Sequence, residues 1–202
     1  MAVILYAGYL ILGDMSDFVG VWLVVSVMAS LVYGWDIKNR GISDSLATLT
    51  GIVYVVLFPY FIVLIDASRY RHFTWLVIIA AFGADIMAYF SGMVFGKHKM
   101  APNLSPKKTV EGAIGGLVGA SIFSALFGYF FMPNIVVQCA IIGVLGGAVS
   151  MAGDLTASAF KRQMGIKDYG KIIPGHGGIL DRFDSVLFVA PFVYYFSVFF
   201  IR

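Results

Sequence analysis

The sequence predicts an all-α integral membrane protein, a polytopic helical bundle with about six transmembrane helices and a cytoplasmic-face active site. Of its 202 residues, 60% are hydrophobic and only 12% are charged, and the mean hydropathy is +0.90. Soluble domains are about half apolar, so this composition indicates a membrane protein. No alternating pattern suggests a barrel, and backbone groups in lipid must be satisfied within their own segment, so helices are expected.

The apolar runs define the expected elements, because about 20 apolar residues cross the hydrocarbon core. In chain order the spans are expected at Phe18–Trp35, Leu46–Ile65, Phe73–Phe95, Ala113–Met132, Ile135–Gly153 and Val186–Ile201. The run Ala2–Leu12 is too short to cross alone, and it lacks the basic region of a signal peptide. Residues 1–202 are expected to form a single membrane domain. Its residues 18–95 hold the N-terminal helices, and residues 96–202 hold a loop, a glycine-rich hairpin, the signature segment and the last helix.

Lysine and arginine are distributed unevenly between the two sides of this predicted bundle. Eleven of the 14 lie in three polar segments, Asp36–Ser45, Gly96–Gly112 and Asp154–Asp184, which the spans place on one side. Arg69, Arg71 and Arg202 lie on the other. Cations favour the cytoplasmic side, so the three segments are expected to meet there. The net charge of +3 is too small to predict a nucleic-acid partner, and one cysteine, Cys139, excludes an internal disulfide framework.

Glycines are frequent in the predicted hairpin Ala113–Gly153 and at its edges. Small residues at such spacings let membrane helices approach closely, and the alternative is a glycine-lined substrate groove. The glycines are Gly112, Gly115, Gly116, Gly119, Gly143, Gly146, Gly147 and Gly153.

The segment Asp154–Asp184, here called the signature segment, concentrates polar side chains in an otherwise apolar chain. If residues 154–164 are helical, Asp154, Ser158 and Lys161 share one stripe. A carboxylate at the end of a membrane span is usually functional, and the alternative is that Asp154 is the N-cap of a following helix. Asp181 and Asp184, brought against Asp154, would form an oxygen site for magnesium. Alternatively, they belong to a solvated cluster beside the membrane.

The cations of the signature segment are candidates for binding phosphate. Attraction to anionic lipid headgroups is the alternative. They are Lys161, Arg162, Lys167, Lys171 and Arg182. In the turn Pro174–Gly178, Gly177 and Gly178 could point amides at an anion, and His176 could donate to a phosphate or transfer a proton. A structural glycine turn is an equal alternative.

Two further pieces carry candidate residues. The segment Ser105–Gly112 contains Lys107, Lys108 and Glu111 at the start of a span, where a simple membrane anchor is the alternative. Asp85 lies inside Phe73–Phe95 with Tyr89 one turn later, and an ionised group within a span is a functional candidate. Pairing of Asp85 with a loop lysine is the structural alternative. Together these features predict a site for a metal and several phosphate groups near the cytoplasmic headgroup layer.

The spacing of these motifs resembles the signature of phosphatidate cytidylyltransferases, also called CDP-diacylglycerol synthases. That signature is S-x-x-K-R, four residues, K-D, then P-G-H-G-G-x-x-D-R-x-D. The chain matches every fixed position with Ser158–Arg162, Lys167–Asp168 and Pro174–Asp184. The pieces Asp85–Phe90 and Ser105–Gly112 are similar to the same family.

The resemblance implies a magnesium-dependent nucleotidyltransferase that joins CTP to phosphatidate and releases pyrophosphate. It implies that Asp154 and Asp181 hold magnesium with Asp184 in support. Lys161, Arg162, Lys167 and Arg182 would neutralise the triphosphate, and Lys107 and Lys108 would bind phosphatidate or nucleotide. The other residues that it implies in substrate binding are Asp85, Ser105, Glu111, Ser158, Asp168, His176, Gly177 and Gly178. The expected location is the bacterial inner membrane, among membrane lipids, and a homodimer is left open.

Two departures from the family pattern keep alternatives open. Ala157 stands where many members carry glutamate, and the chain has fewer spans before residue 80 than is usual, which together are compatible with a weakly active homologue. A CTP-dependent enzyme acting on another lipid phosphate or on a polyprenol is a second alternative. An ion-coupled transporter that uses Asp85 and Asp154 as ion ligands is a third, but the chain shows none of the inverted repeats typical of that class.

Overall fold

The computed structural model describes residues 2–12, 16–33, 41–170 and 177–201. Within them the chain forms two compact units, residues 1–60 and 61–202. The first unit contains α1 (Ala2–Leu12), α2 (Ser16–Tyr33), α3 (Ile42–Gly51), the π-helical turn η1 (Ile52–Leu57) and the start of α4 (Phe58–Ala67). The second contains the rest of α4, then α5 (Phe73–Phe95), β1 (Lys99–Ala101), β2 (Ser105–Thr109), α6 (Val110–Phe131), η2 (Pro133–Ile135), α7 (Val136–Gln163) and α8 (Leu180–Phe200).

Five helical stretches of the described residues are long and apolar enough to cross a membrane. They are Ile42–Ala67, Phe73–Phe95, Val110–Phe131, Pro133–Gln163 and Leu180–Phe200. The predicted class, a polytopic helical membrane protein, is therefore confirmed. The remaining predicted span, Phe18–Trp35, corresponds to α2, whose apolar part Phe18–Tyr33 is shorter than these five.

Several helices extend beyond the apolar runs from which they were predicted. Helix α7 continues past Gly153 to Gln163, and α8 begins at Leu180 rather than Val186. Asp154 thus lies inside a helix, so the alternative that it is an N-cap is wrong. The reason is that hydropathy marks where lipid ends, whereas a helix satisfies its own backbone groups and continues into the polar interface.

The three helices α5, α6 and α7 pack backbone against backbone. A Cβ atom at Gly116 of α6 would lie 2.8 Å from the carbonyl oxygen of Ala84 on α5, and one at Gly143 of α7 would lie 2.5 Å from that of Ala120 on α6. Only glycine permits this approach. The glycines of the predicted hairpin therefore serve helix packing, which was the first of the two interpretations.

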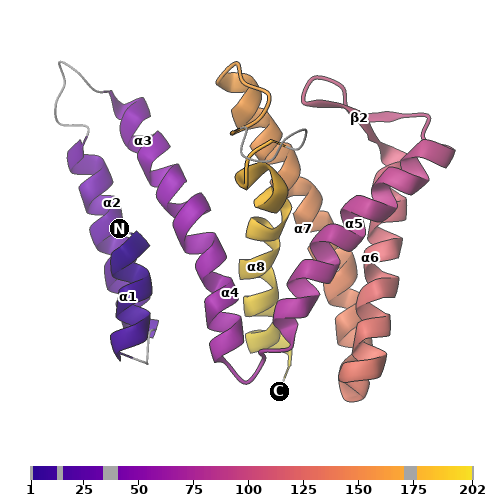
Figure 1. The fold of residues 1–202 in the computed structure, drawn as a ribbon, viewed down its shortest axis with the longest axis horizontal. Helices are drawn as coiled ribbons and strands as arrows, with labels where there is room; N and C mark the ends of the chain where they lie inside the picture. The colour runs from indigo at the N-terminus through magenta and orange to yellow at the C-terminus, as the bar shows by residue number, and fades with distance from the viewer. Residues whose placement is uncertain (1, 13–15, 34–40, 171–176, 202) are drawn as a thin grey trace. The chain divides into compact units, whose positions relative to one another are not determined.

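The polar ends of these helices gather at one end of the second unit. Figure 1 shows the β1–β2 hairpin, the C-terminal end of α7 and the N-terminal end of α8 at the same end. Helix α5 separates this end from residues 68–72, because its 23 residues extend about 35 Å. The hairpin was not predicted from the sequence, since β2 reads Ser-Pro-Lys-Lys-Thr and lacks an alternating apolar pattern.

Candidate active site

A cavity of about 400 Å³ opens where the hairpin meets α5, α6 and α7. We call it the lysine cavity. Its polar lining is Asp85, Ser105, Lys107, Lys108, Thr109 and Asp154, and its apolar lining includes Tyr89, Met93, Met100 and Met151. Tyr89 and Met93 are also 67% and 64% exposed on α5, which a membrane bundle presents to lipid. The cavity therefore joins charged groups to an apolar face.

Lys108 and Asp154 form an ion pair inside the lysine cavity. The Lys108 ammonium nitrogen is buried from solvent. Lys108 lies on β2, and its partner Asp154 lies on α7. Asp85 lies on the neighbouring helix α5, close enough to Asp154 and Lys108 for electrostatic interaction. The sequence suggested that Asp85 pairs with a loop lysine. In the structure the loop lysine Lys108 pairs with Asp154, and Asp85 lies beside this pair.

Ser185 joins Asp85 to the signature segment. Its hydroxyl oxygen lies 3.3 Å from Asp85 Oδ2 and 3.4 Å from Asp184 Oδ1, and its backbone N–H donates to Asp184 Oδ1 at 2.8 Å. Asp184 and Ser185 are both buried, at 5% and 1% exposed. Asp184 is also close enough to Asp154 and Lys161 to interact with them electrostatically. It therefore connects the lysine cavity to the next cluster.

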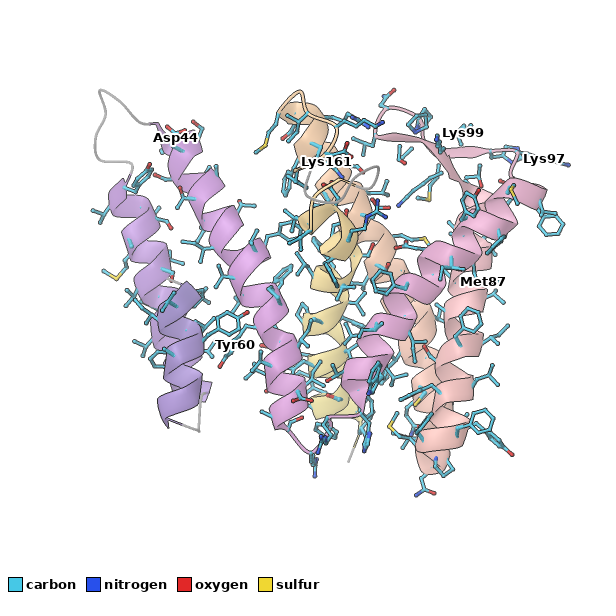
Figure 2. The ribbon with its side chains drawn as sticks, in the orientation of Figure 1. Asp44, Tyr60, Met87, Lys97, Lys99 and Lys161 are labelled. Atoms are coloured by element: carbon cyan, nitrogen blue, oxygen red, sulfur yellow. The ribbon has the colours of Figure 1, made fainter. Side chains whose placement is uncertain are left out.

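The second cluster, here called the Asp181 cluster, consists of Asp181 and its three donors, Lys161, Tyr169 and Gly178. Lys161 Nζ donates to Asp181 Oδ1 at 2.8 Å, and Oδ2 accepts from the backbone N–H of Tyr169 at 2.8 Å and of Gly178 at 2.9 Å. The side chains of Lys161 and Asp181 are 11% and 6% exposed. In Figure 2, Lys161 lies at the same end of the second unit as Lys97 and Lys99 of the hairpin.

Gly177 and Tyr169 both lie against other residues of the Asp181 cluster. Gly177 has φ +82, and a Cβ there would lie 3.1 Å from Asp181 Oδ2, so the position requires glycine. The Tyr169 hydroxyl donates to the carbonyl oxygen of Ala157 at 3.2 Å, and Lys161 Nζ lies 5.3 Å from the centre of the Tyr169 ring. Burial raises the pKa of the Tyr169 phenol, and the charges of Asp181 and Asp184 raise it further. The phenol thus keeps the proton that it donates.

We expect Tyr169 to position Lys161 through its ring more than through its hydroxyl. Tyr169→Phe keeps the ring beneath the ammonium and loses one hydrogen bond, so we expect turnover within about threefold of the parent protein and a loss of about 1 kcal/mol in unfolding free energy. Tyr169→Ala also loses the cation–π contact, and turnover should fall about tenfold. Steady-state rates and melting temperatures of both variants test this, and equal turnover in Tyr169→Ala and the parent would refute it.

Most of the predicted site residues fall into two groups. The first lies in the lysine cavity or the Asp181 cluster, or directly beside them, and comprises Asp85, Ser105, Lys107, Lys108, Asp154, Lys161, Gly177, Gly178, Asp181 and Asp184. Ser158 is buried on α7, between Asp154 and Lys161 in the sequence. The second group is exposed at the surface and comprises Arg162, Lys167, Asp168 and Arg182. Glu111 binds other parts of the chain, as described below, and His176 lies outside the described residues.

Sequence reasoning missed Ser185, Tyr169 and Thr109. Ser185 directly follows the signature, and a small polar residue in the first turns of an apolar helix was the available signal. Tyr169 was an isolated aromatic residue in a polar loop.

Ala157 is fully buried, and its carbonyl oxygen accepts a hydrogen bond from the Tyr169 hydroxyl. A glutamate there would therefore have to desolvate its carboxylate or displace Tyr169.

In this structure the carboxylates predicted to ligate magnesium are paired with other groups of the chain, and they would have to exchange these partners to bind a metal ion. Among the described residues, no group of three or more His, Cys, Asp or Glu side chains is placed to hold one. Asp154 contacts Lys108, and both oxygens of Asp181 accept hydrogen bonds from the chain itself. The carboxylates of Asp154 and Asp181 are thus neutralised by ammonium and amide groups.

Comparison with known proteins identifies relatives along the whole chain. Residues 1–200 match the cytidylyltransferase family. A phosphatidate cytidylyltransferase of Haemophilus influenzae is 47% identical over 128 residues, which is 61% of this chain and 44% of that protein. One of Bacillus subtilis is 38% identical over 174 residues, 84% of this chain and 65% of that protein. The uncharacterised Escherichia coli protein YnbB is 33% identical over 197 residues, 96% of this chain and 59% of that protein.

The three relatives are longer than this chain. The chain spans between 44% and 65% of the lengths of the three relatives. The family match, in contrast, covers nearly every residue of the chain, including the lysine cavity and the Asp181 cluster. The resemblance read from the signature is therefore confirmed, and the chain belongs to the cytidylyltransferase family.

Proposed function

We propose that this protein transfers the cytidylyl group of CTP to phosphatidate, giving CDP-diacylglycerol and pyrophosphate. The observation that carries the proposal is the lysine cavity, which puts Lys107, Lys108 and Asp154 beside the exposed apolar residues Tyr89 and Met93. A lipid phosphate has the same two parts, an anionic head and apolar chains. The relatives that are named phosphatidate cytidylyltransferases support this choice of substrate.

In the proposed reaction, an oxygen of the phosphatidate phosphate attacks the α-phosphorus of CTP. The new oxygen–phosphorus bond forms as the bond from the α-phosphorus to the β-phosphate oxygen breaks, and pyrophosphate leaves. The attacking phosphate is already anionic near neutral pH, so positioning and charge neutralisation supply the catalysis. Lys107 and Lys108 would hold the lipid phosphate in the lysine cavity. Lys161, positioned by Asp181, would face the triphosphate, together with the exposed Arg162, Lys167 and Arg182 of the signature segment.

We also propose that the protein requires magnesium, as the resemblance implies. Support comes from the signature itself, whose carboxylates Asp154 and Asp184 are close enough to interact electrostatically, with Asp85 beside them. Oxygen ligands of this kind suit magnesium, which usually takes one or two carboxylates together with substrate phosphates. The site residues proposed for substrate and metal are those named from the sequence, with Glu111 given a different task below.

A labelled-substrate experiment tests the reaction and separates it from its alternatives. Purified protein in lipid micelles receives phosphatidate, magnesium, and CTP labelled at either the α- or the γ-phosphorus. Cytidylyl transfer moves only the α-label into the lipid phase, whereas a lipid kinase moves only the γ-label. Replacement of phosphatidate by a polyprenol or a polyprenyl phosphate tests other lipid substrates, and chelation of magnesium tests the metal requirement. Lack of label in every lipid fraction would exclude the enzyme class and leave the transporter alternative.

We further propose that the site faces the cytoplasm, in the inner membrane of a bacterium. The motive is the concentration of eleven of the 14 lysines and arginines in three polar segments. Two of these segments lie at the hairpin end of the second unit, whereas Arg69 and Arg71 lie beyond the far end of α5. Bacterial relatives support the choice of membrane.

We expect cysteines placed at the two ends of the second unit to label from opposite sides of sealed vesicles. The variants are Arg71→Cys and Lys167→Cys, each in a Cys139→Ser background that removes the single native thiol. A membrane-impermeant maleimide should reach Lys167→Cys only from the cytoplasmic side and Arg71→Cys only from the other side. Detergent-permeabilised vesicles provide the control for reactivity, and labelling of both cysteines from one side would refute this orientation.

A further inference from the structure

Glu111 forms hydrogen bonds to an earlier segment of the chain, although the family resemblance implied a role in substrate binding. Its Oε2 accepts from the backbone N–H of Lys97 at 3.0 Å and of His98 at 3.2 Å, and its Oε1 lies 2.6 Å from His98 Nδ1. Glu111 is absent from the lining of the lysine cavity. The side chain thus joins two segments of the chain and does not line the lysine cavity.

The two segments that Glu111 joins are the two ends of the hairpin. Lys97 and His98 follow α5 and lead into β1, while Glu111 follows β2 at the start of α6. Lys99 pairs with Thr109 in the two-stranded sheet, and the N–H of Val110 donates to the carbonyl oxygen of His98 at 2.9 Å. The carboxylate therefore closes the base of the hairpin just beyond its last backbone hydrogen bond.

The position of Lys107 and Lys108 depends on this base. Both lysines lie on β2, and Lys108 precedes Thr109, whose hydroxyl accepts from the N–H of Gly112 and caps α6. A two-stranded hairpin has little stability of its own in water. Contacts that hold its ends to α5 and α6 thus determine how steadily Lys108 reaches Asp154 on α7.

We propose that Glu111 is a positioning residue: its carboxylate binds the backbone amides of Lys97 and His98 and so holds the hairpin that carries Lys107 and Lys108 into the lysine cavity. The proposal rests on the proposed function only where it concerns the effect on substrate. Its structural part, the anchoring of the hairpin, stands on the contacts themselves. This role requires a side chain long enough to bring an acceptor oxygen to the two amides, and the negative charge of that side chain is secondary.

Two conservative substitutions separate reach from charge. Glu111→Gln keeps the length of the side chain and an oxygen that can accept from both amides, and its own amide can donate to the unprotonated His98 Nδ1. Glu111→Asp keeps the charge but withdraws the carboxylate by about 1.5 Å, the length of one carbon–carbon bond. His98→Ala is the matched control, because it removes only the contact of an exposed ring.

Hydrogen–deuterium exchange of the full-length protein in lipid micelles measures anchoring without any requirement for activity. We expect the amides of residues 99–110 to exchange about tenfold faster in Glu111→Asp and nearly at the parent rate in Glu111→Gln and His98→Ala. In the proposed reaction, KM for phosphatidate should rise about tenfold in Glu111→Asp with kcat changed less than about threefold. Glu111→Gln should restore most of that loss.

The reverse order of the two variants would overturn the proposal. If Glu111→Gln raises KM more than Glu111→Asp while exchange in the hairpin stays at the parent rate, the charge acts directly on substrate or metal. Unchanged exchange in all variants would equally show that the hairpin is held by other contacts. If no CDP-lipid forms at all, the exchange order still tests the anchoring, so the two failures are distinguishable.

Discussion

Asp181→Asn should lower turnover in the CTP–phosphatidate assay by at least about a hundredfold, comparable with loss of one strong electrostatic contribution. The carboxylate is 6% exposed and accepts from Lys161 Nζ, from the N–H of Tyr169 and from the N–H of Gly178. An asparagine offers one oxygen and one N–H₂ group. If the asparagine oxygen accepts from the two backbone amides, its N–H₂ group points at the Lys161 ammonium, and two donors oppose each other. If the side chain is rotated by half a turn, the N–H₂ group instead opposes the two backbone N–H donors.

The contacts of Asp181 explain the expected loss through Lys161, whereas the sequence explained it through a metal ion. The signature suggested that Asp181 shares a metal ion with Asp154, and the described contacts add a second reason, because Asp181 neutralises Lys161 and binds the amides of Tyr169 and Gly178. Loss of the charge leaves a nearly buried ammonium without its counter-ion, which is costly. The triphosphate contact proposed for Lys161 would then be misplaced.

Asp66→Asn provides the matched control for the Asp181 variant. It makes the same chemical change at an exposed residue at the end of α4, away from the candidate site, and should leave turnover within about twofold. Melting curves of both proteins show whether the loss at Asp181 reflects unfolding. A folded Asp181→Asn protein with near-normal turnover over a magnesium titration would remove Asp181 from the catalytic machinery.

Lys108→Met should lower kcat/KM for phosphatidate by about a hundredfold. The methionine keeps much of the apolar stem and removes the ammonium that pairs with Asp154 in the lysine cavity. Asp154 would then lose its paired cation beside Asp85 and Asp184, and the cavity would repel the anionic headgroup that we propose it binds. The effect combines lost attraction with gained repulsion, so it should exceed that of removing a surface cation.

A double-mutant cycle separates the ion pair from the substrate contact. If Lys108 serves mainly to neutralise Asp154, the Lys108→Met/Asp154→Asn protein should be more stable than the two single losses predict, by about 1 kcal/mol or more. Lys99→Met, at the exposed first residue of β1 in the same hairpin, is the control and should change kcat/KM less than about threefold. Equal losses in Lys99→Met and Lys108→Met would attribute the effect to general surface charge.

Much of the local arrangement followed from periodicity in the sequence. Asp85 and Tyr89, one turn apart, both line the lysine cavity, as expected of residues on one helical face. The five long spans were located because apolar runs of sufficient length have few other uses. These features depend on residues within a few positions of one another, so the sequence contains the information directly.

The residue pairings were decided by the tertiary structure. The sequence placed Asp154, Lys108, Asp85 and Asp184 near one membrane face, and it could not tell which lysine reaches which carboxylate. That choice depends on the hairpin, whose formation the charged segment Ser105–Thr109 gave no pattern to predict, and on how closely glycine lets α6 approach its neighbours. The contacts of Glu111 with Lys97 and His98 could not be predicted from the sequence for the same reason.

By itself, then, the sequence determined that this is a helical membrane protein of the cytidylyltransferase family, and it predicted candidate site residues in the signature segment and in Ser105–Gly112. Only the tertiary structure decided that Lys108 neutralises Asp154, that Lys161 and two backbone amides surround Asp181, and that Glu111 closes the base of the hairpin. Hydropathy and helical periodicity are sums over neighbouring residues. An ion pair between separate elements depends instead on distances of a few ångströms, which helix packing and backbone geometry set.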